Sequence, residues 1–132
     1  MIIETLLKGK DISYETHIID RIIPLETLNL PIDLPASYRK RKNCQNNSIQ
    51  TATRLNCQVV VGEILIEGNV PTNHVWNYID GIHFDVTVND TYKHKYIMYF
   101  MSSINELEEK GYKFDAVKDL QTQYIIKLLE KE

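Results

Sequence analysis

The dipeptide Asp80-Gly81 is the feature that most constrains how this chain can fold. β-Forming residues flank it on both sides, and a two-residue hairpin turn needs positive φ at both positions, which Asp and Gly tolerate. We therefore expect residues 74–79 and 82–88 to pair as an antiparallel hairpin. The predicted cross-strand pairs are Ile79 with Ile82, Tyr78 with His83, Asn77 with Phe84 and Trp76 with Asp85.

In this register a histidine and a carboxylate share one face of the hairpin. His74 is diagonally opposite Asp85 and within side-chain reach of it. An imidazole oriented by a carboxylate makes two members of a nucleophilic triad. The third member would be a Cys or Ser at the N-terminus of a helix, and Cys44 is the candidate for it.

Residues 44–57 form the best predicted helix in the first half of the chain. Asn43 is a suitable N-cap, and neither Pro nor Gly interrupts the segment. Cys44 would lie in the first turn, where the free N–H groups and the helix dipole stabilise a thiolate. The same N–H groups can bind an oxyanion.

Four consecutive cations at positions 39–42 precede this helix. Their positive charge would also favour the thiolate form of Cys44. Two other interpretations stay open for the run: a solvated loop, as is usual for charge runs, or a rim that contacts an acidic or phosphate-bearing group.

The remaining elements predict an α+β fold. Residues 58–66 are almost all apolar and rich in branched side chains, which is typical of a central strand. Residues 96–101 are either a strand or the start of an aromatic helix, residues 103–110 form a helix capped by Ser103, and residues 115–132 form a last amphipathic helix. The buried stripe predicted for this last helix is Val117, Leu120, Tyr124, Ile125, Leu128 and Leu129.

We thus expect the helix that carries Cys44 to pack on a small antiparallel sheet, with terminal helices covering the rest. Residues 1–23 show no clean period. Residues 24–37 contain three prolines and are expected to form an irregular connection.

Length and charge restrict the classes of protein to consider. A chain of 132 residues suits one domain, residues 1–132, with its core at about residues 38–88. The net charge of −3 gives no reason to expect nucleic acid as a partner. No apolar run approaches the roughly 20 residues of a membrane span, and the N-terminus lacks a signal-peptide pattern. We therefore expect a cytoplasmic protein without membrane contact, with reduced thiols and Cys57 as a small core residue; no cofactor is predicted.

Two short motifs resemble the transglutaminase-like core. His74-Val75-Trp76-Asn77 is similar to its His-Ala-Trp motif, and Asp85-Val86-Thr87 is similar to the Asp-Pro-Thr that follows after a short turn. The strand over residues 64–68, which closes in Glu67-Gly68, resembles the strand before the histidine motif in small bacterial and phage members. The resemblance to the transglutaminase-like and papain-like cysteine hydrolase superfamily covers residues 38–88.

This resemblance implies roles for individual residues. Cys44 would be the nucleophile, His74 the general base and then acid, and Asp85 the residue that orients His74. The implied activity is that of a thiol-protease-like hydrolase or an acyltransferase, which acts on an amide, isopeptide or ester bond of a protein or peptide-like substrate through an acyl-enzyme. Such a chain would fit a phage or bacterial accessory protein. The candidate substrate-binding residues are Tyr38, Asn47, Trp76 and Glu67.

Three alternatives remain on the sequence alone. The first is a non-catalytic binding module that contacts a protein or nucleic acid through the basic rim at residues 38–42. The second is a metal site built from Cys44, His74 and His83, although no close ligand pair is present. In the third, these side chains only pack in the core or, as for Asp85, hydrogen-bond a turn.

Overall fold

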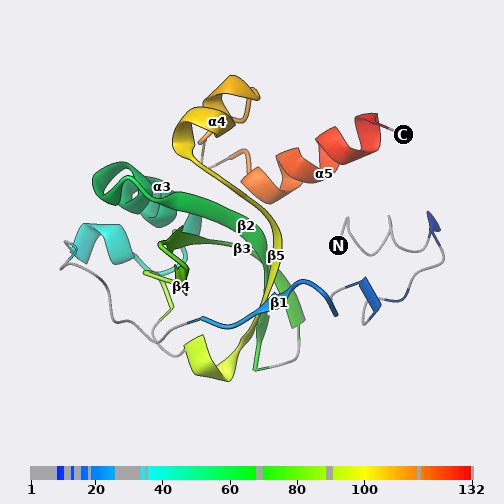
Figure 1. Ribbon diagram of the computed structural model, residues 1–132, viewed down its shortest axis with the longest axis horizontal. Coiled ribbons are helices and arrows are strands. Elements are labelled where there is room, and N and C mark those ends of the chain that lie inside the picture. The colour runs from blue at the N-terminus through cyan, green and yellow to red at the C-terminus, as the bar shows by residue number, and fades with distance from the viewer. Residues whose placement is uncertain are drawn as a thin grey trace.

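The chain forms a mixed α+β fold, seen in a computed structural model as a curled antiparallel sheet with helices on one face (Figure 1). The structure describes residues 9–10, 13, 16–17, 19–25, 34, 36–67, 70–88, 91–115 and 117–131. The five strands of the described sheet are β1 (Ile22–Ile23), β2 (Gln58–Ile66), β3 (Val70–Ile79), β4 (Ile82–Phe84) and β5 (Lys95–Ser102). The three described α-helices are α3 (Cys44–Leu55), α4 (Ile104–Glu109) and α5 (Leu120–Glu130), and two 3₁₀ turns are η1 (Ala36–Arg39) and η2 (Thr91–Lys93).

Strand β2 is the centre of the sheet, whose order is β1-β5-β2-β3-β4. It pairs with β3 along its length and with β5 on its other side, so its prediction as a central strand is confirmed. Residues 96–101, for which the sequence allowed a strand or the start of a helix, lie in strand β5. At Gly62 the register with β5 shifts, and an added Cβ would lie 1.8 Å from the carbonyl oxygen of Ile97. Only glycine permits this approach.

The hairpin of β3 and β4 forms around Asp80 and Gly81, whose φ angles of 45° and 87° are both positive. Three of the four predicted pairs are confirmed: Asn77 with Phe84, Tyr78 with His83 and Ile79 with Ile82. The fourth pair, Trp76 with Asp85, is wrong because β4 ends at Phe84. Asp85 leaves the ladder since its Oδ1 accepts the backbone N–H groups of Thr87 (2.8 Å) and Val88 (3.2 Å), which turns the chain.

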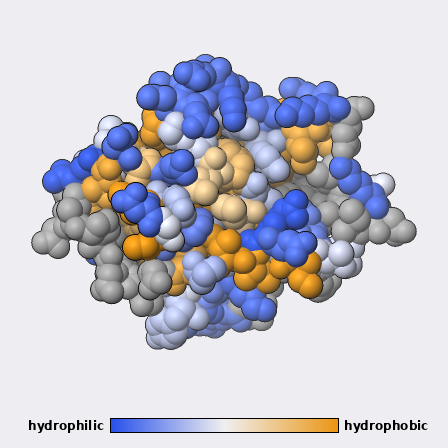
Figure 2. Space-filling model, viewed as in Figure 1, coloured by the Kyte–Doolittle hydropathy of each residue, from blue (hydrophilic) through white to orange (hydrophobic). Residues whose placement is uncertain are grey.

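Two apolar clusters lie on opposite faces of the sheet. The cluster on the helix side joins Ala52 of α3, Leu107 of α4 and Leu120 of α5 to Val59 and Val61 of β2. The cluster on the other face is formed by Val60, Ile64, Trp76 and Tyr96, with Ile23 of β1 packed against it. In the view of Figure 2 hydrophilic residues cover α4, and more apolar side chains gather across the middle of the face, over β5. Within the described sheet β4 pairs only with residues 77–79 of β3, so the earlier residues of β3 have a strand partner on one side alone, β2.

The helices agree with their predicted positions to within a few residues. Helix α3 ends at Leu55, and Asn56 adopts the left-handed conformation that closes it. Ser103 caps α4 by accepting the N–H of Glu106 at 3.2 Å.

Helix α5 begins later than predicted, at Leu120, because Asp119 caps it. Of its predicted stripe, Leu120 and Ile125 are buried, but Val117 and Leu129 are 89% and 46% exposed. For these two residues the prediction is wrong. Val117 precedes the helix, and Leu129 lies in its last turn.

Candidate active site

Cys44, His74 and Asp85 lie together where α3, β3 and the turn after β4 meet. Nε2 of His74 is 2.5 Å from Oδ2 of Asp85, and Cys44 lies near enough to the imidazole to raise its pKa. Because Nε2 is engaged by Asp85, Nδ1 is the nitrogen that remains for the sulfur of Cys44. The three residues singled out from the sequence are therefore connected in the order of a nucleophilic triad.

Asp85 is fully buried and held by several donors. Besides the two backbone N–H groups of its turn, its Oδ2 accepts the hydroxyl hydrogen of Tyr96 at 2.7 Å. These bonds fix the direction from which the carboxylate meets His74. Sequence reasoning missed Tyr96, because nothing in the motif indicates that β5 places this hydroxyl beside Asp85.

The surroundings of His74 favour its protonated form. Burial lowers the pKa of His74. The charge and hydrogen bond of Asp85 and the contact with Cys44 raise this pKa by more than burial lowers it, to about 10. Trp76 packs against the imidazole with ring centroids 6.1 Å apart, and Tyr96 does so at 5.8 Å. An oriented imidazole with a raised pKa therefore lies beside the thiol of Cys44.

The N-terminus of α3 adds hydrogen-bond donors to the site. Asn43 occupies the N-cap position, as predicted, but its side chain makes no capping bond. Within the described part of the chain, the backbone N–H groups of Cys44, Gln45 and Asn46 have no hydrogen-bond partner. They are available for an oxyanion that forms next to the sulfur.

Two hollows meet at Cys44 and His74. The smaller has a volume of about 220 Å³, and Gln45, Asn73 and Asp119 help to line it. The larger is a groove of about 1300 Å³ on the side of η1, and both cysteine and histidine line it as well. A carbonyl group placed at the sulfur could thus have one substituent in each hollow.

Distant segments position the start of α3. Oε1 of Gln45 accepts the N–H of Leu120 at 2.8 Å, and its Nε2 donates to the carbonyl of Asp115 at 2.9 Å. Nδ2 of Asn73 donates to Oδ2 of Asp119 at 2.7 Å. The first of these bonds joins residues 75 positions apart, so no local pattern could have indicated it.

The four predicted substrate-binding residues do not line either hollow. Asn47 is buried and donates to the carbonyl of Lys40 at 2.7 Å and to Oγ1 of Thr87 at 2.9 Å. Trp76 is fully buried, and its Nε1 donates to Nδ1 of His83 at 3.1 Å. For Asn47 and Trp76 the structure corrects the prediction, because buried side chains with internal partners position the fold and do not meet a substrate.

The other two predicted contacts lie nearer to the surface. Tyr38 is half-buried, and the guanidinium of Arg54 lies 5.8 Å from the centroid of its ring. Glu67 is exposed, and its backbone N–H donates to Nδ1 of His94 at 3.0 Å. Their contact with a substrate stays a prediction.

The two cysteines have different surroundings. Both are free thiols, but only Cys44 reaches the hollows. Cys57 is 7% exposed and belongs to the apolar cluster on the helix side, so its prediction as a core residue is confirmed. Burial raises the pKa of Cys57 to about 11.

The described part of the chain shows neither a cluster of metal-ligating side chains nor a membrane-spanning helix. In that part of the chain no three His, Cys, Asp or Glu side chains are grouped so that they could hold a metal ion. His83, one of the proposed ligands, accepts the hydrogen bond of Trp76 instead. No described helix combines the length and apolar character needed to cross a bilayer.

Comparison of the chain with protein-family models, with curated proteins and with solved structures finds no match.

Proposed function

We propose that this protein is a small cysteine hydrolase or acyltransferase of the transglutaminase-like or papain-like kind. Its substrate would be an amide, isopeptide or ester, and it would form a thioester acyl-enzyme on Cys44. The observation that carries the proposal is the buried Asp85–His74 pair, at 2.5 Å, next to Cys44 at the junction of two hollows. A histidine with a purely structural role would not need to face a thiol that solvent can reach.

Acylation would start from a thiolate on Cys44 and an imidazolium on His74. The sulfur of Cys44, as thiolate, attacks the carbonyl carbon, and the resulting oxyanion accepts hydrogen bonds from the free N–H groups at the start of α3. Nδ1 of the His74 imidazolium then gives its proton to the leaving nitrogen or oxygen. The bond to the leaving group breaks, and the products are a thioester on Cys44, a neutral imidazole and a free amine or alcohol. Asp85 keeps the ring in place throughout.

Deacylation reverses these roles. Neutral His74 takes a proton from a water molecule, or from an amine in acyl transfer, as that nucleophile adds to the thioester carbon. The C–S bond breaks and releases an acid or a new amide. Cys44 is again a thiolate beside an imidazolium, so the atoms and charges of the cycle balance.

The alkylation rate of each cysteine against pH tests this proposal, with iodoacetamide as reagent and mass spectrometry to assign the site. We expect Cys44 to react faster than Cys57 at neutral pH and to lose at least tenfold in rate in His74→Ala, because the proposed imidazolium would sustain a thiolate. Cys57, buried in the same molecules, serves as the internal reference. His17→Ala is the matched control, since His17 contacts Tyr99 and does not line the hollows.

A non-catalytic binding module remains the rival, and it predicts the opposite result. In that case Cys44 would titrate as an ordinary thiol in the wild type and in His74→Ala alike. Association through residues 38–42 would then be strongly salt-dependent.

A further inference from the structure

We propose that the larger groove selects an acyl donor whose chain carries a carboxylate, as an acidic peptide segment does. This rests on the proposed function, since it names the substrate of the same Cys44 site. The observation behind it is a contrast of charge. Arg39, Arg41 and Lys42 all line the groove, and among its described lining residues there is neither Asp nor Glu. The chain as a whole has a net charge of −3, so the groove is a local reversal of sign.

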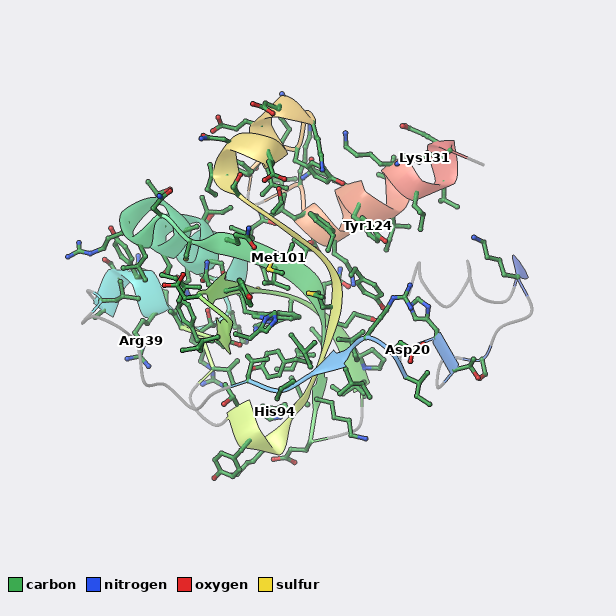
Figure 3. All side chains as sticks on the ribbon, in the orientation of Figure 1. Asp20, Arg39, His94, Met101, Tyr124 and Lys131 are labelled. Atoms are coloured by element: carbon green, nitrogen blue, oxygen red, sulfur yellow. The ribbon has the colours of Figure 1, made fainter. Side chains whose placement is uncertain are left out.

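The three cations are presented to the groove by different means. Arg39, the last residue of η1, is half-buried and donates from Nε to the carbonyl of Val86 at 3.2 Å, which places its guanidinium at the groove. Arg41 and Lys42 are exposed and can adjust to a ligand. Figure 3 shows Arg39 and His94, both groove residues, on the side of η1 and η2, away from Lys131 at the end of α5.

Lys42 lies in an unusual backbone conformation two residues before the nucleophile. Its φ is 65°, a left-handed conformation that Gly or Asn adopts with less strain. Its side chain lines both hollows beside Cys44. The chain therefore holds a cation near the sulfur at a position where backbone energetics alone would favour a small neutral residue.

Size and polarity assign the two hollows to the two parts of the substrate. The groove of about 1300 Å³ has room for a chain, and Ile64, Ile66 and Val88 give it an apolar side for methylene groups. The cavity of about 220 Å³ is lined by one cation, Lys42, and one carboxylate, Asp119, so it lacks the excess of positive charge that the groove has. The acyl chain with its carboxylate thus belongs in the groove, and the amine that leaves or attacks belongs in the smaller cavity.

Two matched esters test this assignment. One is the 4-nitrophenyl monoester of glutaric acid, and the other is the same ester with its free carboxyl blocked as a methyl ester. Each acylation is followed as a burst of 4-nitrophenolate and as a mass increase on Cys44, and each rate is divided by the rate of N-acetylcysteine with the same ester. We expect the anionic ester to react at least tenfold faster after this correction, and the preference to shrink in 0.5 M salt.

The double variant Arg41→Gln/Lys42→Gln should lose most of this preference, whereas Lys110→Gln/Lys131→Gln should keep it. The second variant removes the same number of charges at residues that line a different hollow, next to α5. Circular dichroism confirms that both variants fold. The neutral reagent iodoacetamide, applied to both, reports whether the thiolate of Cys44 survives independently of the groove.

The outcomes separate the two proposals. Equal corrected rates for the two esters, or acylation by neither, with rapid iodoacetamide alkylation would overturn the assignment of the groove and leave the nucleophile in place. Slow alkylation of Cys44 that does not depend on His74 would overturn the proposed function itself.

Discussion

A cysteine lies near each end of α3, and the surroundings of the two thiols indicate which one the proposed function would use. Cys44 is the first residue of the helix, half-buried, next to His74 and to free N–H groups. Cys57 follows the helix, is buried, and donates its N–H to the carbonyl of Ala52 at 3.2 Å. The same side chain therefore faces donors and an imidazolium at one end and an apolar cluster at the other. Position relative to the helix and depth therefore give the two thiols different surroundings.

Replacement of each cysteine gives the largest expected contrast. Cys44→Ala should abolish acylation by the esters, a loss of at least a thousandfold, because no other thiol in the described structure lies at the hollows. Cys57→Ala should keep the acylation rate within about twofold and instead lower the free energy of unfolding by about 1 kcal/mol, since it leaves a small cavity. Burst kinetics and urea unfolding measure the two effects. Comparable loss of acylation in both variants would contradict the comparison.

Asp85→Asn should lower both the free energy of unfolding and the alkylation rate of Cys44. Removing one partner of a buried ion pair typically costs about 3–5 kcal/mol, and both His74 and Asp85 are buried. We expect a loss of this size in urea unfolding, together with a slower alkylation of Cys44. Asp20→Asn, at an exposed position, is the control and should change neither quantity. An unchanged stability in Asp85→Asn would mean that the pair is not charged.

The pH dependence of stability reports the His74 imidazolium directly. Its pKa is raised from 6.5 to about 10 on folding, so the folded state binds this proton more tightly. The stabilisation is complete below about pH 6.5 and is lost as the pH rises toward 10, with a slope of at most about 1.4 kcal/mol per pH unit for one proton.

Unfolding in urea from pH 6 to 10 measures this slope, best in a Cys44→Ala background in which the thiol does not titrate. In that background the protein that keeps His74 should still show the slope, because Asp85 raises the pKa of the histidine. Adding His74→Gln should flatten the curve. Parallel curves with and without His74 would show that the imidazole is neutral in the fold.

Tyr96→Phe should have the smallest effect. It removes one hydroxyl donor from Asp85 and leaves the two backbone donors in place. A single hydrogen bond to a charged group contributes about 1.5–3 kcal/mol, and we expect the lower part of that range together with a few-fold slower alkylation of Cys44. Tyr92→Phe, at a residue that is 73% exposed, should match the wild type.

Local chemistry made part of this structure predictable. The turn at Asp80-Gly81 and the run of branched residues in β2 depend on neighbours in the chain. The hairpin, three of its four predicted pairs and the central strand could therefore be predicted. Residue 44 at the start of a helix likewise followed from a suitable N-cap and an uninterrupted segment. These two elements sufficed to select Cys44, His74 and Asp85 as candidates.

The sequence by itself therefore determined which segments become helix and strand around the site and which residue types could carry its chemistry. Only the tertiary structure decided how deeply each side chain lies and which distant groups it meets. Asp85 leaves its strand, Tyr96 reaches it from β5, and Gln45 joins α3 to α5. Burial and long-range hydrogen bonds depend on the packing of segments far apart in the chain, whereas turns, caps and hydrophobic periodicity depend on residues a few positions apart.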